Sequence, residues 1–341
     1  MAAYTTIDNS ELFFQCQLYT GNGSGGHAIT FDGSENMQPD LVWIKQRDSR
    51  DHFLFNSVSG ATKYVASNTT SDEETDTDTL TAFNSDGFTL GSGIGVNENT
   101  DTHVSWNWKE SATAGFDIVS YTGNGSSRTI SHSLSQVPDW ILVKNRDFDP
   151  SGTSGTNWDV WHSSLTATSG NNLLLNTNAA EASDASKFNS APTSSVFGVN
   201  TNNGVNKADD PFIAYLWCEK QGFSKFGSYV GTNSANPVVV NCGFKPAWIM
   251  IKERSGTGNW VMQDNKRIRD DLSDANNGNM IQLYANSAEG DDSDPYIYTT
   301  ANGFVNINAN SDTNASGATY VYMAFAESPF VNSKGVPNNA Q

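Results

Sequence analysis

PDLVWIKQRD, at residues 39–48, is the stretch that decides the fold, because close copies of it return twice further along the chain. The copies are PDWILVKNRD at residues 138–147 and PAWIMIKER at residues 246–254. In each copy a lysine follows the proline by six positions and an arginine by eight. A proline followed by β-branched and aromatic residues is typical of a buried strand, and we expect the Lys-x-Arg end to emerge into solvent.

Other landmarks repeat around this strand. YTGNG at residues 19–23 returns at 121–125 and, more weakly, as YVGTN at 229–233. Each copy closes with a second hydrophobic strand that ends in glutamate, namely VSWNWKE (104–110), IAYLWCE (213–219) and VYMAFAE (321–327). Between them lie Val65…Asn68, Leu175…Asn178 and Leu283…Asn286, which share a spacing of three. Agreement of several spacings in three copies indicates three related modules of about 100 residues.

We therefore predict an all-β chain of three tandem, diverged β-sandwich modules of jelly-roll type. The expected order is an N-terminal arm (1–10), repeat 1 (11–111), repeat 2 (114–221), repeat 3 (222–328) and a C-terminal tail (329–341) that we expect to be extended. The joints are short, so the modules should pack as neighbours. One short helical piece is expected at residues 264–272.

Composition narrows the class of protein. Aromatic residues make up 11% of the chain and charged residues only 16%, which fits many short strands with polar turns. The net charge of −18 argues against a nucleic-acid partner. Three scattered cysteines predict no disulfide framework and folding in a reducing compartment. The N-terminus lacks the basic start of a secretion signal, and no apolar run approaches about 20 residues, so we expect no membrane insertion.

One acidic run is a candidate for binding a divalent cation such as Ca²⁺. Its carboxylates are Asp72, Glu73, Glu74, Asp76 and Asp78. The run lacks the ligand spacing and the turn glycine of a calcium loop, so a solvated acidic surface is the alternative interpretation. We predict no other cofactor.

We predict no catalytic residue, although one set of carboxylates recurs in every module. These are Glu110, Glu219 and Glu327. Because repetition favours a structural role, we expect them to pair with the equally regular Lys45, Lys144 and Lys252.

Three tryptophans beside polar loops are candidates for stacking on a sugar ring. They are Trp158, Trp161 and Trp260, and packing in the core is the alternative for each.

The whole pattern resembles a family of virion structural proteins of tailed bacteriophages, especially phages of marine bacteria and cyanobacteria. The resemblance rests on YTTIDN (4–9), YTGNG (19–23), QPDLVWIK (38–45), DGFTLG (86–91) and YVYMAFAESPF (320–330), together with VSWNWK (104–109). Repeat 2 departs most, because it lacks the Asp-Gly-Phe turn and the Trp-Asn-Trp-Lys ending. The resemblance implies a component of the phage particle, of the tail-fibre or appendage type. We consider a head decoration protein as the other placement on the particle.

The function that we predict is therefore that of a non-enzymatic virion component, assembled in the host cytoplasm as a homo-oligomer, for example a trimer. Its partners would be other virion proteins and a glycan of the host surface. One alternative is a carbohydrate-binding adhesin for host envelope glycans. Another is a tailspike that degrades polysaccharides.

Overall fold

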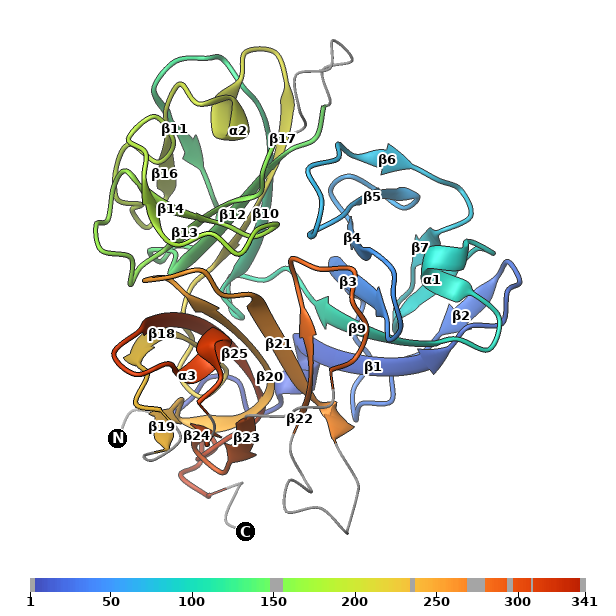
Figure 1. Cartoon of the computed structure of the whole chain (residues 1–341). Coiled ribbons are helices and arrows are strands. Elements are labelled where there is room, and N and C mark those ends of the chain that lie inside the picture. The colour runs from blue at the N-terminus through green and yellow to red at the C-terminus, as the bar shows by residue number, and fades with distance from the viewer. Residues whose placement is uncertain are drawn as a thin grey trace.

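The computed structural model describes residues 4–147, 156–233, 237–268, 280–292, 297–307 and 309–337. Strands dominate, and they gather into three lobes around a common centre (Figure 1). The predicted all-β class with three β-sandwich modules is confirmed. We call the lobes module 1, module 2 and module 3 in chain order.

The elements follow the same order in each module. A short 3₁₀ turn, η1 (Ser10–Leu12), precedes module 1. Module 1 contains β1 (Phe14–Thr20), β2 (His27–Ile29), β3 (Leu41–Gln46), β4 (His52–Asn56), β5 (Lys63–Val65), β6 (Glu74–Thr75), β7 (Leu80–Phe83), β8 (Phe88–Leu90), α1 (Ile94–Asn97) and β9 (Thr102–Trp108). Module 2 contains β10 (Phe116–Thr122), β11 (Arg128–Ser131), β12 (Trp140–Asn145), β13 (Asp159–His162), β14 (Asn171–Leu174), β15 (Ala182–Ser183), β16 (Val196–Val199), α2 (Asn203–Asn206) and β17 (Pro211–Trp217). Module 3 contains β18 (Ser224–Val230), β19 (Val238–Asn241), β20 (Phe244–Glu253), β21 (Trp260–Ile268), β22 (Met280–Tyr284), β23 (Ile297–Thr300), β24 (Gly303–Asn306), α3 (Ser311–Asn314) and β25 (Thr319–Pro329).

Each module is a sandwich of a large and a small antiparallel sheet. The large sheets run β1-β9-β3-β4-β5-β6, β10-β17-β12-β13-β14-β15 and β18-β25-β20-β21-β22. The small sheets are β2-β8-β7, β11-β16 and β19-β24-β23. In all three modules the first strand pairs with the last, and the second pairs with the last but one. This nested pairing is the feature that the modules share with a jelly roll.

The large sheets are buried on both faces, which explains why their strands read as continuous apolar runs. In β3, Val42 and Ile44 face the small sheet of their own module. The alternate residues Leu41 and Trp43 face the opposite way, into a core that all three modules share. Each module therefore has a core of its own and contributes the other face of its large sheet to a joint core.

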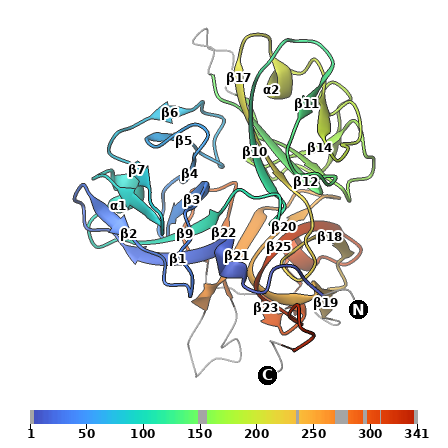
Figure 2. The ribbon, with the colours of Figure 1, turned by 180° about the vertical axis from the view of Figure 1, so that it is seen from behind.

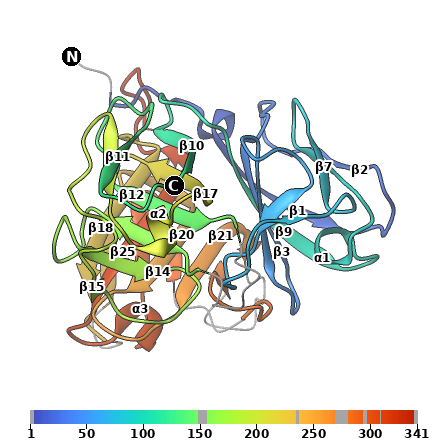
Figure 3. The ribbon, with the colours of Figure 1, turned by 90° about the horizontal axis from the view of Figure 1, so that it is seen from above.

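This central core holds eight of the nine tryptophans, and Trp161 alone lies in the core of module 2. The view from behind shows the same three lobes (Figure 2), and in the view from above module 2 overlies module 3 while module 1 lies beside them (Figure 3). Most of the tryptophans therefore pack in the core that the three modules share, and not in the core of a single module.

The repeat needs one correction in its register. Val65, Leu173 and Leu283 occupy equivalent places, because each pairs with the fourth strand of its large sheet. The asparagines three positions later accept a hydrogen bond from the backbone N–H at the start of that strand. They are Asn68, Asn176 and Asn286, with N–O distances of 2.8–3.0 Å. The pairing of Leu175…Asn178 with the other copies was therefore wrong by two residues.

The helix expected at residues 264–272 is also wrong where the structure describes it. Asp264 to Ile268 is the end of β21, and Trp248 of β20 pairs with Asp264. Strand pairing overrides the charged, helix-like local sequence there. Residues 269–272 lie outside the described residues.

The two ends of the chain meet at module 3. The hydroxyl of Tyr4 donates to the Gly243 carbonyl at 2.9 Å, and that of Ser10 donates to the Glu327 carbonyl at 2.7 Å. The described part of the tail turns back on itself, with Val331 bridged to Pro337, and is not extended as expected. Among the described residues no helix has the length and apolar character needed to cross a membrane.

Candidate functional site: the module junctions

The repeated polar residues meet where one module contacts the next. The segments that begin at the last residue of β14 and of β22, and directly after β5, leave their own module and lie against a neighbour. We call these segments straps, and they comprise residues 66–73, 174–181 and 284–291. Each strap makes the same four contacts with the neighbouring module, so the three junctions are copies of one another.

The first contact comes from the residue that begins, or just precedes, the fourth strand. Trp158 donates its Nε1–H to the Ala66 carbonyl at 2.8 Å, and Trp260 donates to the Leu174 carbonyl at 2.9 Å. His52 takes this place in module 1, with Nε2 at 3.0 Å from the Tyr284 carbonyl. All three acceptors are the first residue after the β5, β14 or β22 residue that sets the register.

The second contact is made by the lysines of the Lys-x-Arg motif, which are fully buried. Their ammonium groups donate to strap carbonyls four residues further along, at 3.0–3.3 Å. The pairs are Lys144 with Thr70, Lys252 with Asn178 and Lys45 with Ala288. Burial lowers the pKa of Lys45 and Lys252 to about 8 and that of Lys144 to about 7.

The arginines make the remaining two contacts, with the acidic residue at the end of the strap. Three ion pairs of 2.6–2.8 Å join Arg146 to Glu73, Arg254 to Glu181 and Arg47 to Asp291. In each pair the backbone N–H of the acidic residue also donates to the carbonyl of the arginine, at 2.7–3.1 Å. The prediction that Lys-x-Arg emerges into solvent was therefore wrong, because this motif is the joint between modules.

The junctions close a ring. Module 2 holds the strap of module 1, module 3 holds that of module 2, and module 1 holds that of module 3. A fifth repeated position, at the end of the fourth strand of the large sheet, adds a contact to the same pairs of modules. Asn56 donates to the Tyr215 hydroxyl at 3.0 Å, and His162 Nε2 lies 3.3 Å from the Tyr322 carbonyl. A single chain thus forms a pseudo-three-fold ring in which every module contacts both others.

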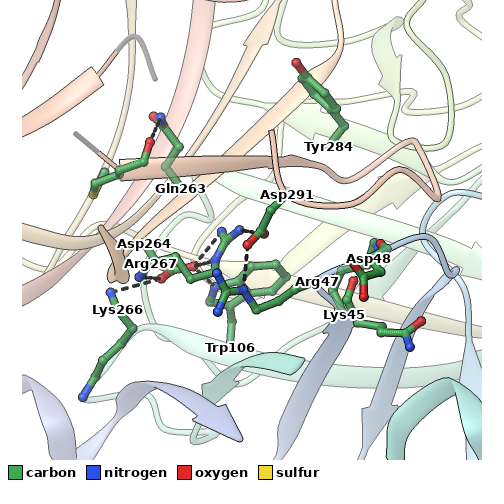
Figure 4. A network of polar contacts seen from close by, with 12 residues as sticks. Lys45, Arg47, Asp48, Trp106, Gln263, Asp264, Lys266, Arg267, Tyr284 and Asp291 are labelled. Atoms are coloured by element: carbon green, nitrogen blue, oxygen red, sulfur yellow. Dashed lines mark hydrogen bonds and ion pairs between the residues drawn. The ribbon is translucent and has the colours of Figure 1, made fainter. Parts of the chain in front are cut away.

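The junction between modules 3 and 1 has an additional buried ion network (Figure 4). Asp264, equivalent to Asn56 and His162, accepts from Trp106 Nε1 at 3.0 Å and from Arg267 Nε at 2.8 Å. Arg267 also donates to Asp291 at 2.7 Å, and Asp291 pairs with Arg47 on its other oxygen. The guanidinium lies over the Trp106 ring, 5.7 Å from its centroid. One carboxylate therefore bridges two arginines across the junction that closes the ring.

Acid is expected to weaken this closing junction through His52. Trp43 donates to its Nδ1 at 2.9 Å, so the neutral ring carries its proton on Nε2, facing the Tyr284 carbonyl. Burial lowers the His52 pKa to about 3, whereas an unfolded histidine titrates near 6.5. The unfolded state thus binds more protons between these values, and stability falls as the pH falls. From about pH 7 to about pH 5 we expect a loss of roughly 2 kcal/mol from this group.

Urea unfolding at both pH values measures this loss. His52→Gln keeps an N–H donor but does not titrate, so its free energy of unfolding should fall less on acidification than that of the parent. Equal falls in parent and variant would contradict the assignment.

The tryptophans proposed for sugar stacking have no open face. Trp158 and Trp260 are buried in the central core, and Trp161 is buried in the core of module 2. The stacking hypothesis for these three rings is therefore corrected. They lie beside polar loops in sequence, but the neighbouring modules or the small sheet cover them.

The first two residues of the acidic run, Asp72 and Glu73, belong to the strap of module 1. Glu73 binds Arg146 of module 2, Glu74 accepts from the Tyr64 hydroxyl at 2.7 Å, and the Asp78 carbonyl accepts from Gly93. Asp76 Oδ1 accepts from the Asp78 backbone N–H at 2.8 Å. Asp72 lies close enough to Lys144 to raise its pKa against the effect of burial. Within the described ranges no three His, Cys, Asp or Glu side chains come together as a metal site, so these five residues are not gathered around a cation.

The regular glutamates do not pair with the regular lysines. Glu219 binds Lys225 at 2.7 Å, and Glu327 binds Lys245 at 3.1 Å. Glu110 Oε1 accepts from the Ile118 backbone N–H, and burial raises its pKa to about 7. The expected pairing was wrong, because the lysines point to the straps while the glutamates stay near the start of the following module or beside β20.

Sequence reasoning did not identify the strap residues Glu181 and Asp291, or the pair Asp264 and Arg267. A signal for the first two exists: Glu73, Glu181 and Asp291 each lie eight positions after the equivalent Val65, Leu173 and Leu283. The misaligned second copy concealed that spacing.

The comparisons with known proteins give the family. No curated protein matches the sequence. Residues 9–329 match a family model described as a domain of unknown function, DUF7483. That match covers all three modules and all three junctions, and the chain therefore belongs to the DUF7483 family.

Proposed function

We propose that the chain is a non-enzymatic structural component of a bacteriophage virion, in a tail fibre, an appendage or a head decoration. The resemblance of its repeated motifs to virion proteins of tailed phages supports this proposal. So does the use that the chain makes of its most regular charged residues, since Lys-x-Arg in all three modules holds a neighbouring module in place.

The observation that carries the proposal is the closed ring. Each large sheet is buried on both faces, and each junction combines buried lysine, an ion pair and backbone hydrogen bonds. A component of a particle must keep its shape under mechanical force. Three modules that each contact both of the others resist deformation. Free, buried cysteines agree with assembly in the reducing cytoplasm of the host.

The partners proposed are other virion proteins and further copies of the chain, with a trimer as one arrangement. The three straps are already occupied within one chain, so such copies would associate through other surfaces. A host surface glycan is a further proposed partner, and its contacts would lie outside Trp158, Trp161 and Trp260.

Labelled particles test the proposal. An epitope tag after Gln341 and antibody-gold imaging of purified phage should place the gold at one kind of position on intact particles. An untagged phage is the control. Protein that is abundant in the lysate but absent from purified particles would contradict the proposal. Release of oligosaccharides from host envelope glycans by the pure protein would contradict its non-enzymatic part.

A further inference from the structure

Module 2 contains a buried polar cluster that none of the junctions uses. Asp159 in β13 is 1% exposed, and its Oδ1 contacts Lys187 Nζ at 2.5 Å. The same oxygen contacts Asn172 Nδ2 of β14 at 3.4 Å, and Asn172 is equally buried. Because both nitrogens contact one oxygen, they lie within two hydrogen-bond lengths of each other.

Comparison with the equivalent residues of module 1 shows what the cluster replaces. In module 1 the equivalent places hold Phe53 and Tyr64, with ring centroids 4.8 Å apart, and Thr79. The equivalence of Thr79 and Lys187 rests on their carbonyls, which accept from the backbone N–H groups of Gly91 and Asn200 at the same distance of 2.7 Å. A carboxylate, an amide and an amine thus replace an aromatic pair and a threonine at one place that is partly buried.

Module 2 also differs in its small sheet. Modules 1 and 3 have a third strand there, β7 and β23, whereas the described small sheet of module 2 is β11-β16. The loop that carries Lys187 runs where β7 runs in module 1, because the Phe188 and Leu80 carbonyls accept from equivalent residues, Gly170 and Thr62. This loop therefore lacks the strand pairing that holds its counterpart.

A buried ion pair is a poor substitute for aromatic packing, since desolvation offsets much of its attraction. In addition, no described residue donates to the buried Oδ1 of Asn172. Burial raises the pKa of Asp159 to about 6, which favours its protonated form relative to an exposed carboxyl. Turning the Asn172 amide over, which exchanges its oxygen and nitrogen, would bring Oδ1 to a protonated Asp159.

We propose that Lys187 and Asn172 form an intramolecular isopeptide bond, with Asp159 as the proton carrier. Asp159 takes a proton from the Lys187 ammonium group, which leaves a neutral amine. The amine nitrogen attacks Cγ of Asn172 while Asp159 donates its proton to Oδ1. Asp159 next carries one proton from the attacking nitrogen to Nδ2, and the Cγ–Nδ2 bond breaks. The Oδ1 hydroxyl gives its proton to the departing ammonia as the carbonyl reforms, so the nitrogen leaves as ammonium. No oxidant or cofactor is required, and Asp159 is regenerated as a carboxylate.

The bond would tie the loop of Lys187 covalently to β14. In a chain whose described cysteines are all free, it would supply the constraint that a third strand supplies in modules 1 and 3. This inference is independent of the proposed function.

Mass spectrometry of the purified full chain is decisive and needs no variant. The intact mass should lie below the sequence mass by one ammonia molecule, and a digest should contain a branched peptide joining the segments of Asn172 and Lys187. An unmodified mass would overturn the proposal. Loss of one water molecule would also overturn it, because the bond would then join Lys187 to Asp159.

Variants test the roles of the three residues. Asp159→Ala, Asn172→Ala and Lys187→Arg should each abolish the mass loss and the branched peptide. Asp210→Ala is the matched control, since it removes the carboxylate of another ion pair of module 2, with Lys207 at 3.2 Å. The control should keep the mass loss. A branched peptide that persists in Asp159→Ala would contradict the proton-carrier role.

Discussion

Asp264→Ala is expected to lower the free energy of unfolding by about 4 kcal/mol, because it removes one of the two carboxylates that pair with a fully buried arginine, Arg267. Asp264 accepts hydrogen bonds from the side chains of Arg267 and Trp106 and from the backbone N–H groups of Lys266 and Arg267. Alanine replaces none of these acceptors. Asp291 cannot compensate, because it already shares its charge with Arg47.

Denaturant unfolding of the parent and the variant measures this loss. The double variant Asp264→Ala/Arg267→Met removes the unpaired charge and should recover a large part of the stability. Glu219→Ala is the matched control: it breaks an ion pair with Lys225 in which each side chain is one-third exposed, and it should cost less than about 1 kcal/mol. If Asp264→Ala is as stable as the Glu219→Ala control, the buried network is contradicted.

Trp248→Ala is expected to lower the free energy of unfolding by about 4 kcal/mol, which is typical of truncating a core aromatic residue. The ring is fully buried, and its centroid lies 5.4 Å from that of Trp108 and 6.4 Å from that of Trp106, both in module 1. It also lies 6.0 Å from Phe325 of its own module. Truncation therefore opens a cavity between modules and not only within one.

The cooperativity of unfolding gives this prediction its second readout. Because the modules share one core, the parent chain should unfold in a single transition, and Trp248→Ala should move that whole transition. Trp161→Ala is the comparison variant, since that ring lies in the core of module 2, and it should move the same single transition. Three separate transitions in the parent, only one of which responds to Trp248→Ala, would contradict a shared core.

Much of the fold could be predicted because it rests on local pattern. The run at residues 39–48 and its copies locate β3, β12 and β20, and the runs ending in Glu110, Glu219 and Glu327 locate β9, β17 and most of β25. Predictions failed where a distant partner decides the outcome. Asp264 and Arg267 look helical in isolation, but β20 and Trp106 of module 1 place them in a strand.

By itself, the sequence determined that three copies of one β unit exist and which of their side chains avoid water, because apolar spacing depends on the backbone alone. It left open what each buried face packs against. The same alternation of apolar residues would suit a strand whose outer face packs against a second copy of the chain, against another protein or against another module of the same chain. Only the tertiary structure decided that the three outer faces meet each other. That placement brings each strap to its Lys-x-Arg across more than 70 residues of chain, and it turned motifs expected in solvent into joints of a ring.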